Sequence, residues 1–389
     1  MVRPARLFVF SILLALALTG PAVAQRGDPY AEASNWTVGM MTGTLDGTSL
    51  RMANDMALVL DSGPDLRIVP MIGEGSIRNV TDLTYLKGVD IAIIQSDVLS
   101  LLRRTKRMPG IEDQLQYLAK LHSEEFHVLS RMKYLCLADL TGRKVNFGPA
   151  GSGSALTAQA IFEASKVQVQ PQYLDYATGL EKLRKAELDA VVFVSGKPSP
   201  AFDHIRFTDA VHFLDVDFVD EVQRDYLPAI LTHDDYPELI AENETVSTIA
   251  VSAVLAVAKS PPKSERYRKL ERFVDALFGK IDQFRMPAHH AKWREVALSA
   301  PLAGWTRFPA AQQWLKDHPE SAAARTSPAA TLDAESGRLQ NLSGIDEPEA
   351  KKIQILFEMY KRDRESTDKD NSEKLFSEFI RWYQQRSLN

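Results

Sequence analysis

The chain has little of what disulfide bonding or nucleic-acid binding requires. It contains 389 residues and one cysteine, Cys136, so no intrachain disulfide can form and stability must come from packing. Because Cys136 lies in the apolar run 134–138, we expect its thiol to be buried and structural. The 46 lysine and arginine residues are outnumbered by 51 aspartate and glutamate residues, which gives a net charge of −5. Since the sequence has no basic stripe, we expect no nucleic-acid partner.

The motifs that mark common enzyme classes are missing as well. The sequence has no Gly-x-Ser-x-Gly elbow, no His-Glu-x-x-His motif and no phosphate loop ending in Gly-Lys-Ser or Gly-Lys-Thr. The clusters 233–235 and 289–290 contain histidine but lack a spaced third ligand, so structural or solvated roles are expected there. We therefore predict no catalytic residue, no metal site and no cofactor. An enzyme built on the same fold is the alternative.

A hydrophobic run lies close to the N-terminus. Arg3 and Arg6 precede the apolar residues 7–18, and Ala22 and Ala24 place small side chains at the two positions that determine cleavage. This pattern predicts a secretory signal peptide over residues 1–24, cleavage after Ala24 and a periplasmic protein. The alternative is an uncleaved anchor, although the run is shorter than the roughly 20 residues of a spanning helix.

Two segments of the chain repeat one pattern, in which a helix end, an acidic residue, an apolar strand and a polar loop follow each other. Asp90 introduces the strand 89–94, and Asp189 introduces the strand 188–194. Both strands are nearly continuous apolar runs, which is typical of parallel strands covered by helices on both faces. The sequence therefore predicts two α/β units. In such sheets ligands bind beyond the carboxyl ends of the strands.

Four loops occupy that position, and the loop at 148–154 is the most informative. Glycine allows close approach of the backbone, and the first N–H groups of the following helix lack intrahelical partners. Such a turn suits a small anionic ligand. The other three loops contain Gly47, Gln95 and Gly196. Any one of them alone is better explained as an ordinary turn, but four loops at corresponding strand ends favour a binding site.

Taken in order, these motifs resemble the TAXI family of solute receptors, the extracytoplasmic binding proteins of TRAP transporters. The resemblance runs from about Trp36 to Pro319. The motifs that carry it are Gly43 with Gly47-Thr48, Gly75-Ser-Ile-Arg-Asn79, Gln95-Ser-Asp97, Gly148-Pro-Ala-Gly-Ser-Gly153 and Gly196-Lys-Pro-Ser-Pro200. The chain departs from the family pattern at Glu74, where a second glycine is usual, and at Ser49 and Leu50, where aromatic residues are common.

The resemblance implies a type II periplasmic binding protein, an α/β fold with two lobes that are each a mainly parallel sheet flanked by helices. Lobe I would comprise residues 33–137 with 246–319, and lobe II residues 138–245, with crossings near 131–138 and within 236–252. The lobes would close on a small solute, a carboxylate or an amino acid, and present it to a TRAP-type membrane permease. The implied ligand-binding residues are Gly47, Thr48, Gln95, Ser96, Gly151, Ser152, Gly153, Ser154, Gly196 and Tyr236.

The tail of the chain extends beyond the resemblance. A small-residue linker is expected over 320–345 and a helical extension over 346–389. Ile353, Phe357 and Tyr360 belong to one apolar helical stripe, and Phe376 and Phe379 belong to a second. The two stripes either pack back on the receptor body or dock on another protein. In the second case the partner would be a membrane sensor in a signalling system instead of a permease.

Overall fold

The computed structural model describes residues 36–45, 47–219 and 225–319. The expected signal peptide (1–24), linker (320–345) and helical extension (346–389) lie outside the described residues. Within the described ranges, no helix has both the length and the apolar character needed to cross a membrane.

The first lobe is built on three parallel strands near the start of the chain. Strand β1 pairs with β2 on one side and with β3 on the other, in parallel in both cases. Helix α3 contributes Met52, Met56 and Leu60 to the core, because residues four apart lie on one face of a helix. The elements of this lobe are β1 (Thr37–Met41), α3 (Thr48–Leu60), β2 (Arg67–Met71), α4 (Ser76–Tyr85), β3 (Ile91–Gln95), α5 (Val98–Thr105), η1 (Ile111–Asp113), α8 (Glu265–Gly279), α9 (Ile281–Phe284), η6 (Ala291–Glu295) and α10 (Pro309–Asp317).

The second lobe repeats the arrangement with β5 between β6 and β7, again in parallel. Ser152 and Asp175 are the N-cap residues directly before helices α6 and α7, and their side chains accept hydrogen bonds from the first turn of each helix. The elements of this lobe are η2 (Leu137–Leu140), β5 (Lys144–Asn146), α6 (Gly153–Ala164), β6 (Gln170–Gln172), α7 (Tyr176–Arg184), β7 (Ala190–Ser195), η3 (Pro200–Phe202), η4 (Phe207–Asp209), β8 (Val211–Phe213) and β9 (Leu227–Thr232).

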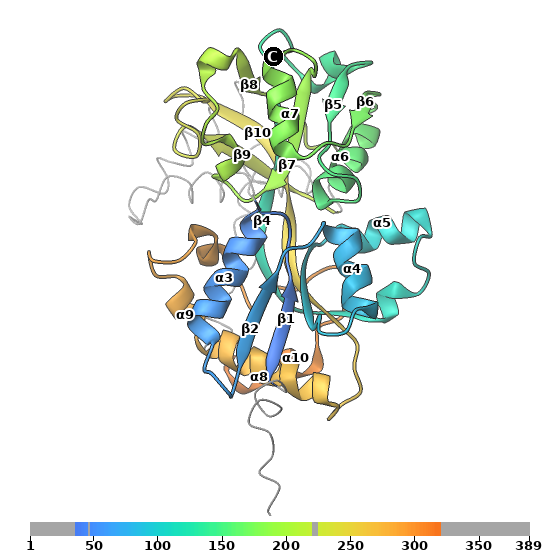
Figure 1. Cartoon of the computed structure of the whole chain (residues 1–389), viewed down its shortest axis with the longest axis vertical. Helices are drawn as coiled ribbons and strands as arrows, with labels where there is room; N and C mark the ends of the chain where they lie inside the picture. Colours follow the sequence, from blue (N-terminus) through green and yellow to red (C-terminus); the bar gives the residue numbers. More distant parts are fainter. Residues whose placement is uncertain (1–35, 46, 220–224, 320–389) are drawn as a thin grey trace, which may run out of the picture.

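Two long antiparallel strands, β4 (Leu115–Arg131) and β10 (Thr245–Ala258), run through both lobes. The sheet order is β2-β1-β3-β10-β4-β7-β5-β6, with β8 paired to β4 and β9 paired to β10. Figure 1 shows the two lobes one above the other, with β4 and β10 crossing between them. The two-lobed α/β architecture expected from the sequence is therefore confirmed, and β3 and β7 are the two strands that its apolar runs predicted.

The chain crosses between the lobes inside β4 and β10. Along β4, Leu121 packs in the core of the first lobe and Phe126 in that of the second. Along β10, Val251 packs with the second lobe and Ala253 with the first. We therefore propose that the chain passes from one lobe to the other between Leu121 and Phe126 and again between Val251 and Ala253, compared with the expected crossings near 131–138 and within 236–252. Both strands continue through the crossing without a turn. The sequence therefore shows no change in composition at the point where the chain passes from one lobe to the other.

Candidate ligand-binding site

A cavity of about 60 Å³ lies where the two lobes meet. It is found beyond the carboxyl end of β3, as the sequence pattern predicted for a ligand site in a sheet of this kind. Both lobes contribute to its wall. The lining residues are Gly43, Thr44, Gly47, Ser49, Gly75, Ser76, Asn79, Ile93, Ile94, Gln95, Glu124, Ser152, Gly153, Ser154, Tyr176, Phe193 and Val194.

Three helices begin at this cavity. The residues that precede α3, α4 and α6 are Gly47, Gly75 and Ser152, and all three line it. The Ser152 hydroxyl accepts a hydrogen bond from the Ala155 N–H at 3.1 Å, whereas α3 and α4 have no side-chain cap. Free N–H groups and the positive ends of three helix dipoles therefore converge on one space. This arrangement suits a small anionic group.

A buried carboxylate forms another part of the wall. Glu124, on β4, accepts hydrogen bonds from Gln95 Nε2 at 2.8 Å and from Ser49 Oγ at 3.1 Å. The Nε2 atom of His122, a residue of the same strand, lies 3.5 Å from Glu124 Oε1. Burial alone would raise the pKa of Glu124. The contact with His122 and its charge, together with the hydrogen bonds from Gln95 and Ser49, outweigh burial and lower this pKa below its usual value. Glu124 is therefore ionised at neutral pH.

Glu124 was not predicted from the sequence. The signal that could have revealed it is the pair Glu124-Glu125, two carboxylates in the middle of a strand that is otherwise almost fully buried. Buried carboxylates are rare unless they are paired, so such a pair indicates a specific role.

The lobes touch at the cavity. A Cβ atom at Gly153 would lie 2.1 Å from Gln95 Oε1, so only a glycine at this position allows Gln95 to reach the start of α6. The hydroxyls of Thr48 and Ser195 lie 3.3 Å apart, and Thr48 also donates to the Gly196 carbonyl at 3.4 Å. The structure is therefore a closed form, in which polar contacts join the lobes.

A second set of contacts between the lobes centres on Asp97, the residue before α5. Its Oδ2 atom accepts hydrogen bonds from Thr157 at 2.8 Å and from Tyr226 at 2.9 Å, both of which belong to the second lobe. Close by, Ser100 donates to Asp225 at 2.7 Å. Burial raises the pKa of Asp97 to about 6, even though the two hydrogen bonds act in the opposite direction.

The structure brings some of the sequence-derived residues together at the cavity. Gly47, Gln95, Ser152, Gly153 and Ser154 line it. Thr48 lies beside it and is buried against Ser195 and Gly196.

Four other sequence-derived residues lie outside the cavity lining. Ser96 continues the β3 pairing, because its N–H donates to the Ser252 carbonyl at 2.8 Å. Gly151 adopts φ +79° in the turn before α6, and a Cβ atom there would meet nothing within 4 Å. Gly196 faces Thr48 and Lys292 at the edge of the site. Tyr236 is buried in the second lobe.

Tyr236 forms part of a buried hydrogen-bond chain there. His127 Nδ1 faces the Phe193 carbonyl at 3.2 Å, so Nδ1 carries the proton and Nε2 is an acceptor. The Tyr236 hydroxyl donates to this Nε2 at 2.7 Å and accepts from the Ser199 N–H at 2.9 Å. Burial lowers the pKa of His127 to about 4, which keeps the imidazole neutral. The Tyr236 hydroxyl therefore both donates and accepts a hydrogen bond inside the second lobe.

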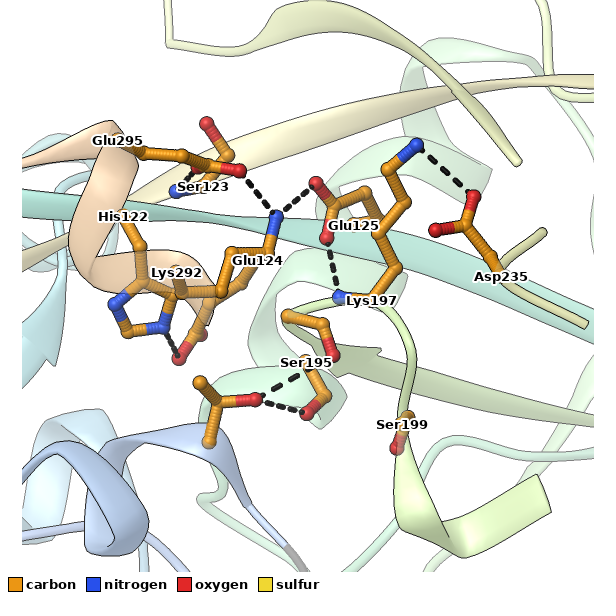
Figure 2. A network of polar contacts seen from close by, with 12 residues as sticks. His122, Ser123, Glu124, Glu125, Ser195, Lys197, Ser199, Asp235, Lys292 and Glu295 are labelled. Carbon is orange, nitrogen blue, oxygen red and sulfur yellow. Dashed lines mark hydrogen bonds and ion pairs between the residues drawn. The ribbon is translucent and has the colours of Figure 1, made fainter. Parts of the chain in front are cut away.

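Charged side chains join the lobes on the other side of β4 (Figure 2). Glu125 accepts from Lys292 Nζ, on η6 of the first lobe, at 2.7 Å and from the Lys197 backbone N–H of the second lobe at 2.8 Å. Lys292 also contacts Glu295 at 2.9 Å, and the ammonium of Lys197 contacts Asp235 at 3.0 Å. Burial lowers the pKa of Lys292, but Glu125 and Glu295 outweigh that effect and hold the pKa above its usual value. A buried ion pair thus lies where β4 crosses between the lobes.

Comparison with known proteins gives a family match and distant structural similarity. The NMT1-like family matches residues 40–302, about two thirds of the chain. The periplasmic binding protein BugD is similar with 13% identity and a TM-score of 0.44, over 74% of this chain and 96% of that one. The aliphatic sulphonate binding protein SsuA from Escherichia coli is similar with 15% identity and a TM-score of 0.37, over 72% of this chain and 78% of that one. AbpA from Streptococcus pneumoniae is an amino acid ABC transporter substrate-binding protein whose structure was solved with L-arginine. It is similar with 11% identity and a TM-score of 0.38, over 68% of this chain and 98% of that one.

Proposed function

Since the chain belongs to the NMT1-like family, we propose that it is an extracytoplasmic receptor that binds a small, carboxylate-bearing solute between its two lobes. The observation that carries this proposal is the convergence of three helix N-termini on one polar cavity at the lobe junction. Uncapped N–H groups hold an anion without a buried countercharge, which would be costly to desolvate.

Closure of the lobes is the proposed binding step. The two β strands that connect the lobes allow them to hinge, and the closed form is held by contacts such as Thr48 with Ser195 and Asp97 with Thr157. A solute that contacts both lobes favours this form, because it gains interactions that the open form does not offer. The solute contacts we propose come from Gly47, Thr48, Gln95, Ser152, Gly153 and Ser154. No catalytic step is assigned to these groups.

The resemblance to TAXI receptors supports delivery of the solute to a TRAP-type permease and a periplasmic location after cleavage at Ala24. Two measurements test these parts of the proposal. Mass spectrometry of the exported protein should find Gln25 as its first residue. A host strain that lacks the gene should lose uptake of the labelled solute, whereas unchanged uptake would contradict the transport role.

Calorimetry tests the binding site itself. The exported wild-type protein should release heat with at least one compound from a panel of carboxylates, amino acids and sulfonates. The variant Gly153→Ala should lose this response, because the added methyl group would overlap Gln95. Gly279→Ala is the matched control, since Gly279 is also a helical glycine but has nothing within 4 Å of its added methyl group. Equal binding by wild type and Gly153→Ala would argue against this cavity as the site.

A further inference from the structure

One wall of the cavity presents hydrogen-bond acceptors instead of donors. Glu124 supplies a carboxylate that is only 7% exposed. Because Gln95 directs its Nε2 atom to Glu124, its Oε1 atom faces the start of α6, near Gly153. The carboxylate of Glu124, on β4, and the amide oxygen of Gln95, at the end of β3, therefore line the same space.

Asn79, on α4, adds a third acceptor. Its Nδ2 atom donates to the Thr42 carbonyl at 2.7 Å and to the Ile93 carbonyl at 3.2 Å. Its Oδ1 atom is buried and has no hydrogen-bond partner among the described residues. The side chain is 1% exposed and lines the cavity. A buried acceptor of this kind is costly unless a donor reaches it. The Oδ1 atom lies against Gly73, behind the lining, so it adds to the acceptor character of this wall without opening into the cavity.

The charge of His122 stabilises ionised Glu124 from outside the cavity, but none of the described residues that line the cavity has a cationic side chain. The nearby lysines are engaged elsewhere, since Lys292 contacts Glu125 and Glu295, and Lys197 contacts Asp235. His122 contacts Glu124 at 3.5 Å, but it is not part of the cavity lining. A solute with only negative groups would therefore bring its charge into a buried space that already holds a carboxylate. Like charges at such a site repel each other strongly.

We infer that the solute carries a protonated nitrogen beside its anionic group, and that Glu124 selects it by binding this nitrogen. The helix N-termini hold the anionic group, while Glu124 binds the nitrogen and Gln95 Oε1, which also accepts from the Ser76 hydroxyl at 3.5 Å, lies on the same wall. Solutes that are purely anionic, such as dicarboxylates and sulfonates, are rejected by the same carboxylate. This inference rests on the proposed receptor function and specifies the class of solute.

Calorimetry with matched pairs of compounds tests the inference. The pairs are glycine and acetate, L-alanine and propionate, and L-glutamate and glutarate, which differ only in the amino group. We expect wild type to bind the amino member of at least one pair at least tenfold more tightly than its partner. In Glu124→Gln, binding of that amino member should weaken at least tenfold and the preference should fall below about threefold. Glu74→Gln, at an exposed position next to Gly75, makes the same charge change outside the cavity and should retain the preference.

The outcomes separate the inference from the function on which it rests. If wild type binds a desamino compound as tightly as its amino partner, or if Glu124→Gln keeps the preference, the inference is wrong while the receptor function stands. If no compound of any pair or of the wider panel binds wild type, both are wrong. Should Glu124→Gln fail to fold, as judged by circular dichroism, the preference of wild type within the pairs still decides the question.

Discussion

Gly75 of the first lobe lies directly against Ser152 of the second, so that a Cβ atom at Gly75 would stand 2.5 Å from the Ser152 Cα. No side chain fits between the two backbones in the closed form. Gly75 precedes α4 and Ser152 precedes α6, so this contact also brings two of the three helix N-termini to the cavity.

Substitution of Gly75 by alanine should therefore prevent full closure. We expect Gly75→Ala to bind the solute at least tenfold more weakly and to show a larger radius of gyration by small-angle X-ray scattering in the presence of solute. Gly88→Ala is the control, because Gly88 also has a positive φ, +86°, but nothing lies within 4 Å of its added methyl group. Both alanines introduce backbone strain, so only the difference between them reports on closure. Identical scattering curves for the two variants would refute this role of Gly75.

The hydroxyl of Thr48 should contribute to closure through its contacts with Ser195 and Gly196. Thr48→Val keeps the shape of the side chain but removes the hydroxyl. A typical net hydrogen-bond contribution is about 0.5–1.5 kcal/mol, so the solute affinity should fall by roughly 2- to 13-fold. Calorimetric titration measures this loss. Thr84→Val is the control, since the Thr84 hydroxyl bonds only within its own helix, to the Val80 carbonyl. A Thr48→Val protein that binds like wild type would show that the contact is incidental.

Closure should strengthen as the pH falls, because of Asp97. The closed form binds a proton at Asp97 with a pKa of about 6, whereas the ordinary pKa of aspartate is 3.8. Between about pH 4 and pH 6 the closed form therefore holds more protons than an open form that exposes Asp97, and acid favours closure. Above about pH 6 this advantage is lost. The shift of this pKa from 3.8 to about 6 makes closure at most about 3 kcal/mol less favourable at neutral pH than in acid.

Solute titrations from pH 4.5 to 7.5 check this expectation with wild type and Asp97→Asn. The amide can still accept hydrogen bonds from Thr157 and Tyr226 but does not titrate in this range. We expect wild type to lose affinity as the pH rises and Asp97→Asn to change less, with tighter binding than wild type at neutral pH. His127 and His290, whose pKa values burial lowers to about 4, are present in both proteins, so their protonation cancels in the comparison. Parallel pH profiles would contradict the assignment to Asp97.

The ion pair between Lys292 and Glu125 should be important for stability. Lys292→Met leaves the Glu125 carboxylate buried without its ammonium partner, and loss of one member of a buried pair typically costs about 3–5 kcal/mol. Urea denaturation of wild type, Lys292→Met and the double variant with Glu125→Gln measures the free energy of unfolding. We expect the double variant to be more stable than Lys292→Met. If the single variant unfolds at the same urea concentration as wild type, the pair has no such role.

Much of the fold and part of the site follow from the sequence, for physical reasons that particular residues illustrate. The apolar runs ending at Ile94 and Val194 predicted strands, because parallel strands are buried on both faces, and the observed strands end one residue later. The turn before Gly153 predicted a helix start, because serine and glycine suit its backbone. These signals are local, so they can be recognised in a single sequence.

Other features depend on distant contacts that no local pattern reveals. Glu124 lies at the cavity only because β4 passes from one lobe to the other. Tyr236 was expected at the site, but the position of its hydroxyl is set by His127, which is 109 residues away in the sequence. The apolar neighbours of Cys136 predicted a buried thiol, yet Cys136 is exposed, so this prediction was wrong. Cys136 precedes the short helix η2, and only Leu137 and Leu140 of that helix turn inward.

The most direct test of the account is a crystal structure of the wild-type protein with the compound that gives the largest calorimetric response. We expect a closed protein with density for the compound between Gln95, Ser76 and Ser152, and with the anionic group of the compound facing the N-termini of α3, α4 and α6. Density for the compound only outside the lobe junction, for example in the surface groove beside Phe162 and Tyr173, would contradict it.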